Sequence, residues 1–182
     1  IEEGSHKFEL VTVNPGLITG PPIKKEAYTS GDMMKGIITG AFSPVPKVSY
    51  PMVDVRDVAE AHVRALTVKE AAGRRFILNS GDHWMSELAS TIADEYAPKG
   101  WPVTTEVGEG GDFAPILDNT ASKDVLGINY IDLKTSVIDT IEAMLKIGSL
   151  AMPGAAGEAQ PDGSAGGEAE AQGEAGTGEQ AD

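Results

Sequence analysis

Residues 8–21 limit the possible folds more than any other part of the chain. Residues 10–13 have the apolar, β-branched composition of a strand that is buried on both faces, as in a parallel sheet covered by helices. Pro15 ends this strand, and Gly16 and Gly20 then allow backbone conformations and close contacts that a side chain would prevent. Ligands of open α/β sheets bind at the carboxyl ends of strands, so this turn is the first candidate site.

The rest of the chain alternates between short strand patterns and helical patterns. Strands are predicted over residues 48–53, 75–79 and 99–107, with a turn at residues 80–82. Helical spacing of apolar residues predicts helices at residues 30–42, 54–66, 85–96 and 132–147, and a helical turn at 122–126. This alternation indicates an α/β fold, and the small number of strands indicates an incomplete one.

Two aspartates open the second predicted helix. Asp54 is placed to accept hydrogen bonds from free amides of the first turn, and Asp57 lies where the helix dipole favours a carboxylate. Acid/base catalysis by this pair is the alternative. Between them, Arg56 is predicted to pair with Glu60 at helical spacing, with anion binding as the other possibility.

Composition separates a folded part, residues 1–149, from an acidic tail rich in Gly, Ala and Glu, residues 150–182. The tail has no aromatic residue and no Lys or Arg, and its seven acidic residues carry half of the formal net charge of −14. Such a segment cannot bury enough apolar surface to offset its ordering entropy, so we expect it to be disordered. The acidic balance argues against nucleic acid or an anionic membrane as the principal partner.

Several classes of site are excluded by residue usage. The chain has no cysteine, and His6, His62 and His83 show no metal-ligand spacing, so no metal site is predicted. No apolar run approaches the roughly 20 residues that cross a bilayer. We expect a cytoplasmic protein. Because the chain starts at Ile1 rather than at methionine, we also expect it to be a fragment of a longer protein.

Two motifs carry a family resemblance. The first is Val-Asn-Pro-Gly-Leu-Ile-Thr-Gly-Pro at residues 13–21, and the second is Tyr-Pro-Met-Val-Asp-Val-Arg-Asp-Val-Ala-Glu-Ala-His at residues 50–62. In this order they resemble the second half of the extended short-chain dehydrogenase/reductases, in particular the dihydroflavonol-reductase and cinnamoyl-CoA-reductase type of the NAD-dependent epimerase/dehydratase superfamily. The resemblance implies an incomplete Rossmann-type fold, with the last parallel strands and a substrate-side subdomain, and without the dinucleotide-binding half.

The same resemblance implies the site residues. The backbone of four residues would lie against the nicotinamide ring and its carboxamide: Pro15, Gly16, Leu17 and Ile18. Four side chains would fall on the substrate side: Met33, Ile37, Tyr50 and Met52. For the Met and Ile stripe at helical spacing, plain core packing is the alternative. No catalytic residue is assigned to this chain, because the glycine-rich turn and the catalytic Ser, Tyr and Lys of the family belong to the other half.

Two formal motif matches lack the context that their chemistry needs. Residues 176–181 fit the dinucleotide fingerprint, but no strand precedes them. Tyr130 and Lys134 have the Tyr-x-x-x-Lys spacing of short-chain reductases, yet Asp132 is the predicted cap of the last helix. The two side chains would then not share one helical turn, so we do not assign them a catalytic role.

The resemblance implies an NADP-dependent reductase, with NAD not excluded, that converts a small ketone or aldehyde to an alcohol. This chain would supply the substrate-side half and the nicotinamide-contacting turn. The alternative is an inactive remnant, or an interaction module with an acidic tail. We expect no turnover by the chain alone, and we expect aggregation, because an incomplete sheet leaves an edge and an apolar face uncovered.

Overall fold

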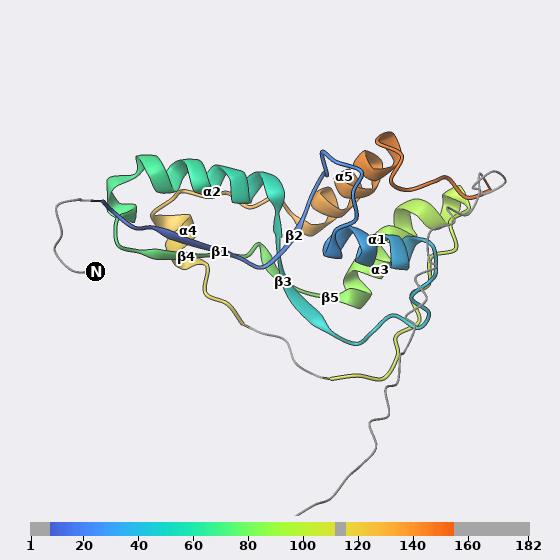
Figure 1. Ribbon diagram of the computed structural model, residues 1–182. Coiled ribbons are helices and arrows are strands. Elements are labelled where there is room, and N and C mark those ends of the chain that lie inside the picture. The colour runs from blue at the N-terminus through green and yellow to red at the C-terminus, as the bar shows by residue number, and fades with distance from the viewer. Residues whose placement is uncertain (1–7, 112–115, 155–182) are drawn as a thin grey trace, which may run out of the picture.

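The computed structural model describes residues 8–111 and 116–154. The described strands are β1 (Thr12–Pro15), β2 (Leu17–Thr19), β3 (Ser49–Asp54), β4 (Arg75–Leu78) and β5 (Gly81–Trp84). The helices are α1 (Thr29–Ile38), α2 (Val55–Thr67), α3 (Met85–Tyr96), α4 (Thr120–Asp124) and α5 (Leu133–Lys146), with short 3-10 turns η1 (Lys69–Ala71) and η2 (Ala97–Lys99). Figure 1 shows β1, β4, α2 and α4 at one end of an elongated molecule, and α1, α3 and α5 at the other.

The strands form two small sheets that share one continuous piece of chain. In the first sheet, β1 pairs in parallel with β4. In the second, β2 pairs in parallel with β3, and β3 pairs antiparallel with β5. Only Gly16 separates β1 from β2, so the chain leaves the first sheet and enters the second at this residue. The fold is α/β with parallel strands, as the sequence predicted.

A first core lies between the β1–β4 sheet and the helices α2 and α4. Phe76 and Leu78 of β4 are fully buried there, together with Ala61 of α2 and Leu126, which follows α4. Val13 of β1 packs against this cluster. Helix α2 thus covers the sheet with Val58 and Ala61, whereas Val63 and Leu66 of its predicted apolar stripe are exposed, so that prediction is wrong in part.

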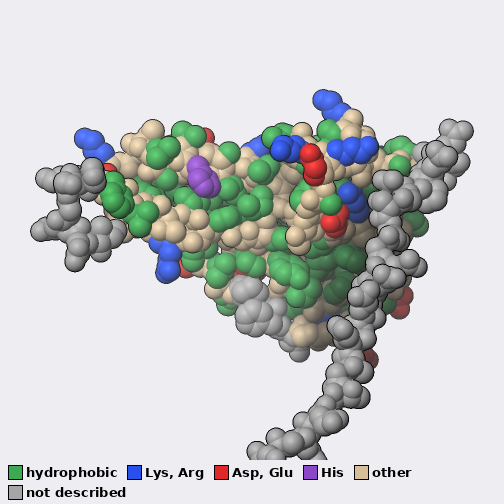
Figure 2. Space-filling model, in the orientation of Figure 1, with side chains coloured by type: hydrophobic (Ala, Val, Ile, Leu, Met, Phe, Trp, Pro, Cys, Tyr) green, Lys and Arg blue, Asp and Glu red, His purple; other side chains and the backbone are tan. Residues whose placement is uncertain are grey.

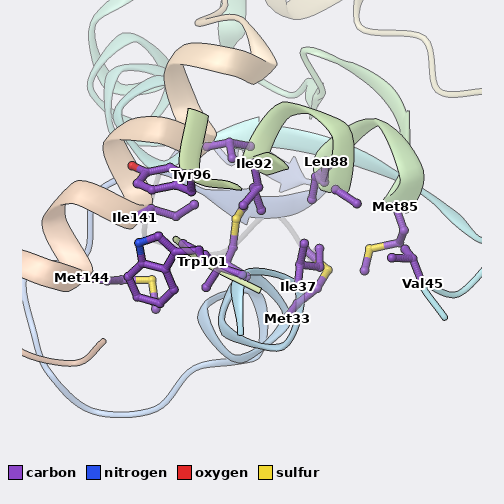
Figure 3. Packing of buried hydrophobic residues seen from close by; sticks show 14 of the residues in the cluster. Met33, Ile37, Val45, Met85, Leu88, Ile92, Tyr96, Trp101, Ile141 and Met144 are labelled. Atoms are coloured by element: carbon purple, nitrogen blue, oxygen red, sulfur yellow. The ribbon is translucent and has the colours of Figure 1, made fainter. Parts of the chain in front are cut away.

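A second and larger core joins α1, α3 and α5 (Figure 3). Ile37 and Ile92 are completely buried, and so is Ile141. The rings of Tyr96 and Trp101 meet edge to face, with centroids 6.4 Å apart. Five methionines belong to this core, where their flexible side chains can fill irregular gaps: Met33, Met34, Met52, Met85 and Met144.

Most predicted elements are confirmed. The first strand, predicted over residues 10–13 as buried on both faces, is instead β1 at Thr12–Pro15, and Leu10 is 56% exposed. Two further predictions are wrong. The predicted strand over residues 99–107 is absent, because only Val107 makes an isolated bridge, to Val45. Trp101 is instead drawn into the core beside Tyr96, so the apolar residues of this segment serve packing. The predicted turn at residues 80–82 is wrong in part, since strand β5 begins at Gly81 and pairs with β3.

Some of the predicted features lie outside the described residues. Most of the predicted disordered tail and the formal fingerprint at residues 176–181 lie there. Within the described part, Leu150 is buried in the helical core and its amide donates to the Met144 carbonyl. None of the helices over the described ranges is long and apolar enough to cross a membrane. Residues 8–111 and 116–154 also hold no cluster of three or more His, Asp or Glu that could bind a metal ion.

Candidate functional site

The turn between β1 and β2 presents bare backbone at the carboxyl end of β1. The amide of Gly16 donates to the Leu78 carbonyl, 3.0 Å away, which ties the turn to the end of β4. A Cβ at Gly16 would lie 2.3 Å from the Pro51 carbonyl oxygen. The chain can therefore cross from one sheet to the other only because position 16 has no side chain.

The end of β2 requires glycine for two reasons. Gly20 has a φ of +102°, a conformation that L residues with side chains rarely adopt. A Cβ at this position would also lie 2.7 Å from Oδ2 and 2.8 Å from Oδ1 of Asp54. The chain thus turns away from β2 directly against a buried carboxylate.

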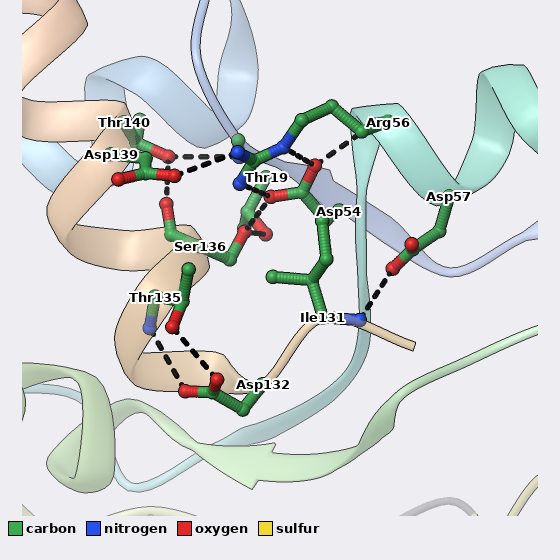
Figure 4. Close-up of polar contacts among 11 residues, drawn as sticks. Thr19, Asp54, Arg56, Asp57, Ile131, Asp132, Thr135, Ser136, Asp139 and Thr140 are labelled. Atoms are coloured by element: carbon green, nitrogen blue, oxygen red, sulfur yellow. Dashed lines mark hydrogen bonds and ion pairs between the residues drawn. The ribbon is translucent and has the colours of Figure 1, made fainter. Parts of the chain in front are cut away.

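Asp54, the last residue of β3, is the centre of a polar network (Figure 4). Its side chain is fully buried and accepts four hydrogen bonds. Three come from Arg56, through the backbone amide, Nε and Nη2 at 2.8, 2.8 and 2.9 Å. The fourth comes from the Ser136 hydroxyl at 2.6 Å. Burial alone would raise the pKa of Asp54, but these donors outweigh burial and hold the pKa below its usual value.

These contacts decide between the interpretations of the two acids and the arginine. Asp54 is the N-cap of α2, as predicted from its position. The predicted pairing of Arg56 with Glu60 is wrong: Arg56 binds Asp54 and, at 2.7 Å, Asp139, whereas Glu60 pairs with Arg64. The Asp54 carboxylate is fully buried, whereas Glu60 is exposed to solvent, which weakens an ion pair. Arg56 therefore pairs with Asp54 rather than with Glu60.

Asp57 has a separate structural role. It is 5% exposed, and its Oδ2 accepts a hydrogen bond from the Ile131 amide at 3.0 Å. Burial raises the pKa of Asp57, and the Ile131 amide only partly offsets this effect. The contact fixes the chain between α4 and α5 against the first turn of α2. Both acids are therefore occupied by the fold, which favours capping and packing over acid/base catalysis.

Helix α5 holds the end of β2 through two hydroxyl groups (Figure 4). The Thr19 and Ser136 hydroxyl oxygens lie 2.8 Å apart, and the amide of Gly20 donates to Thr140 Oγ1 at 2.8 Å. All three hydroxyl-bearing residues are at least 96% buried. The candidate turn is thus fixed at one end by β4 and at the other by α5.

A cavity of about 870 Å³ opens beside this turn. Its walls are residues 16–24 and 26–30 with Val55, Arg56 and Ala59 from the start of α2. Tyr28 occupies the N-cap position of α1, and the hydroxyl of Ser30, in the first turn, donates to the Ile18 carbonyl at 2.5 Å. The turn and the cavity offer mainly apolar walls and backbone groups, with the polar side chains of Lys24, Glu26, Tyr28 and Arg56 also in the lining.

The structure brings the predicted cofactor residues together and divides the predicted substrate residues. Gly16, Leu17 and Ile18 line the cavity, next to Pro15 at the end of β1. Three of the predicted substrate residues are buried in the helical core: Met33, Ile37 and Met52. Tyr50 is 38% exposed on β3, where it pairs with His83 of β5. The core alternative considered for the Met and Ile stripe describes the packing of α1, and a contact with substrate stays a prediction.

Tyr130 is placed as expected for a residue outside the last helix. Helix α5 begins at Leu133, with Asp132 as its cap, so Tyr130 and Lys134 do not share a turn. The Tyr130 hydroxyl lies 2.7 Å from the Ser122 hydroxyl. The formal Tyr-x-x-x-Lys match is therefore a coincidence of spacing.

Sequence reasoning missed the residues of α5 that contact the candidate site. Ser136, Asp139 and Thr140 follow the i, i+3, i+4 spacing of one helical face. Ser136 and Thr140 are buried beside Val137 and Ile141. A polar side chain on the apolar face of a helix is buried, and buried polar groups are hydrogen-bonded. This pattern in α5 could have indicated that Ser136 and Thr140 have partners elsewhere in the fold.

The chain is similar in sequence to known reductases, although no family model matches it. It is 33% identical over 162 residues to the ketoreductase azaE of Aspergillus niger, covering 80% of this chain and 46% of the relative. It is 29% identical over 150 residues to the cinnamoyl-CoA reductase CAD2 of Medicago truncatula, covering 79% of this chain and 45% of the relative. The chain thus spans about half the length of the curated relatives that it matches.

The fold is similar to a solved reductase structure as well. The crystal structure of the yeast methylglyoxal/isovaleraldehyde reductase Gre2 complexed with NADPH matches with a TM-score of 0.64 and 31% identity. The match covers 79% of this chain and 45% of Gre2. The sequence comparisons and the structure comparison therefore both find reductases, and in both the chain matches less than half of the relative's length.

Proposed function

Because the chain belongs to the extended short-chain dehydrogenase/reductases, we propose that it is the substrate-side half of an NADPH-dependent reductase of small carbonyl compounds. The overall reaction converts a ketone or aldehyde, NADPH and a proton into an alcohol and NADP⁺. The single observation that carries the proposal is the match, at 31% identity, to a reductase complexed with NADPH. In this chain the turn between β1 and β2, followed by the cavity, lies at a strand's carboxyl end, where such folds bind ligands.

Two features of the turn fit a nicotinamide cofactor. Gly16 lines the cavity with backbone atoms alone. Asn14, directly before Pro15, has a buried Nδ2 with no hydrogen-bond partner among the described residues, and a carboxamide oxygen would satisfy it. Pro15, Gly16, Leu17 and Ile18 are thus the residues proposed to hold the ring.

The bound cofactor would supply the hydride, and this chain would bind and orient. The backbone of residues 15–18 would set the face of the ring that meets the carbonyl carbon. The apolar walls of the cavity would exclude water from that carbon. The proton for the carbonyl oxygen comes, in this proposal, from a residue in the other half of the enzyme.

An uncovered surface marks where the other half would dock. Among the described residues, β1 is paired along one edge only, with β4. A groove of about 460 Å³ runs between β1 and α2, and Leu10 and Leu66 on its walls are 56% and 89% exposed. Figure 2 shows hydrophobic side chains over β1 and below α2 on this face. We propose that a parallel strand pairs with the free edge of β1 and that a helix fills the groove.

The test is the steady-state reduction of a small aldehyde with NADPH by two proteins, the 182-residue chain and the protein at its native length. The proposal predicts turnover by the native-length protein and none by the isolated chain. Turnover by the isolated chain would contradict the half-enzyme proposal. Absence of turnover and of NADPH binding in the native-length protein would contradict the reductase proposal and favour an inactive or interaction role.

A further inference from the structure

The contacts between α5 and the end of β2 do more than close the core. We infer that Thr140 and Ser136 are positioning residues for the cofactor-contacting turn: they fix the Gly20 end of β2, and with it the backbone of residues 15–18. This inference rests on the proposed function. It adds a role for α5, a helix that does not line the cavity beside the turn.

The direction of each hydrogen bond in this network can be worked out from the available protons. The Thr140 hydroxyl lies 2.6 Å from the Ser136 carbonyl oxygen, which can only accept, so the single proton of Thr140 is used there. Thr140 Oγ1 is then left as an acceptor, and the amide of Gly20 donates to it at 2.8 Å. Ser136 likewise gives its proton to the Asp54 carboxylate at 2.6 Å.

The remaining contact follows from the same count. Since the only proton of the Ser136 hydroxyl is directed to Asp54, the Thr19 hydroxyl is the donor in the 2.8 Å contact with Ser136, which is much shorter than its other contact, 3.4 Å to the Val53 carbonyl oxygen. Two directed chains therefore leave β2 for α5, one from the Thr19 hydroxyl and one from the Gly20 amide. The Ser136 and Thr140 hydroxyls each give their proton to a group that can only accept, which removes freedom from the end of β2.

The other end of the turn is fixed independently. The Gly16 amide is hydrogen-bonded to the Leu78 carbonyl, and residues 17–19 are paired with β3, so the contacts with α5 add the anchor at the Gly20 end. Releasing the α5 anchor frees only the Gly20 end. The turn would then populate positions that do not bind the cofactor, and the apparent affinity falls in proportion to the fraction of time in the competent position.

The site is also protected against a simple replacement of these contacts by water. Thr19, Ser136 and Thr140 are 4%, 2% and 1% exposed. The carboxylate of Asp54 already has four donors and cannot compensate for a lost hydroxyl on α5. A change at Thr140 must therefore be accommodated by movement of the Gly20 segment.

The test compares Thr140→Val with a matched control in the native-length protein. Valine keeps the shape of threonine and removes its acceptor, so the Gly20 amide loses its partner. Thr91→Val in α3 is the control, because the Thr91 hydroxyl bonds the carbonyl four residues earlier, as that of Thr140 does, but contacts no part of the turn. Thr140→Ser restores the hydroxyl, and Ser136→Ala releases the second chain.

We expect Thr140→Val to raise the dissociation constant of NADPH about fivefold, measured by calorimetric titration, and Ser136→Ala to raise it by a similar factor. Thr140→Ser should restore it to within twofold, and Thr91→Val should leave it unchanged. Hydrogen exchange at the Gly20 amide should accelerate in Thr140→Val only. A purely structural role would lower the melting temperature of Thr140→Val without changing the dissociation constant.

The outcomes separate the inference from the proposed function. The positioning role is overturned if Thr140→Val and Thr91→Val bind NADPH with equal dissociation constants although hydrogen exchange at the Gly20 amide is faster in Thr140→Val. The reductase proposal stands in that case. If Thr140→Val does not fold, the NADPH dissociation constant of Ser136→Ala is compared with that of Thr91→Val instead. Failure of the wild-type native-length protein to bind NADPH overturns the reductase proposal, and the positioning role with it.

Discussion

Gly16 lies against Pro51 so closely that a Cβ on the glycine would be 2.3 Å from the proline's carbonyl oxygen and 2.8 Å from its carbonyl carbon. Both atoms belong to the backbone of β3, which is paired on both sides and cannot move aside cheaply. The position of the turn between the two sheets thus depends on a missing side chain.

Replacement of Gly16 by alanine should therefore move the turn. We expect Gly16→Ala to lower the free energy of unfolding by about 1–3 kcal/mol, the usual cost of forcing extra volume into a packed site. NADPH affinity should fall as well, by about tenfold or more. Gly111→Ala is the control, since a Cβ there has no neighbour within 4 Å. Thermal unfolding and NADPH titration would measure both effects, and equal results for the two variants would contradict the close approach.

Asp54→Asn tests the centre of the polar network. The amide keeps the volume of the carboxylate but replaces an acceptor by a donor that faces Arg56 or Ser136. We expect a loss of about 2–3 kcal/mol, the range for hydrogen bonds to a buried charged group. Glu60→Gln, which weakens an exposed pair with Arg64, should cost at most about 0.5 kcal/mol. Urea unfolding of both variants would measure these losses in the free energy of unfolding. Similar losses for the two variants would contradict the central role of Asp54 in the network.

The pKa of Asp54 predicts the pH dependence of stability. The pKa is lowered in the folded state, whereas an unfolded aspartate titrates near about 3.9. Its contribution to stability is therefore complete above the unfolded value and is lost as pH falls through the lower, folded value. The wild type should lose stability steeply below about pH 4, and Asp54→Asn less steeply. Equal slopes for both proteins in urea unfolding at pH 5, 4 and 3 would contradict this assignment.

Leu66 tests the proposed docking groove. It is 89% exposed on α2 beside β1, where we propose that a helix of the other half packs. Leu66→Lys should keep the isolated chain monodisperse at higher concentration, because it interrupts the exposed apolar surface. In the native-length protein the same change should lower the melting temperature, since a lysine is then buried. Ile116 is 92% exposed and lies outside the groove, so Ile116→Lys should also keep the isolated chain monodisperse but should not lower the melting temperature of the native-length protein.

Local patterns in the sequence predicted the parts of the fold that local physics determines. Asp54 and Asp132 were expected as helix caps, and each accepts a hydrogen bond from its own helix. The turn at Gly16 and Gly20 was expected from glycine and proline chemistry alone. The resemblance to a family then predicted that this turn contacts a cofactor, and that contact stays a prediction.

Contacts between distant segments could not be predicted in the same way. Thr19 and Ser136 are 117 residues apart, and Gly20 and Thr140 are 120 apart, so neither pairing leaves a trace in local spacing. Arg56 was assigned to Glu60 because that residue is near in sequence, whereas Asp139 comes close only after α5 packs. Trp101 was read as part of a strand because its attraction to the helical core is a tertiary effect.

If these 182 residues are one half of a reductase, as we propose, the native protein must be much larger than this chain, and its intact mass decides the question. The chain alone has a mass of 19.0 kDa and covers 46% of the relative azaE. We expect a native mass well above 19.0 kDa, with a glycine-rich turn and the catalytic residues in the additional sequence. A native mass close to 19.0 kDa would contradict it and leave the chain as a remnant or an interaction module.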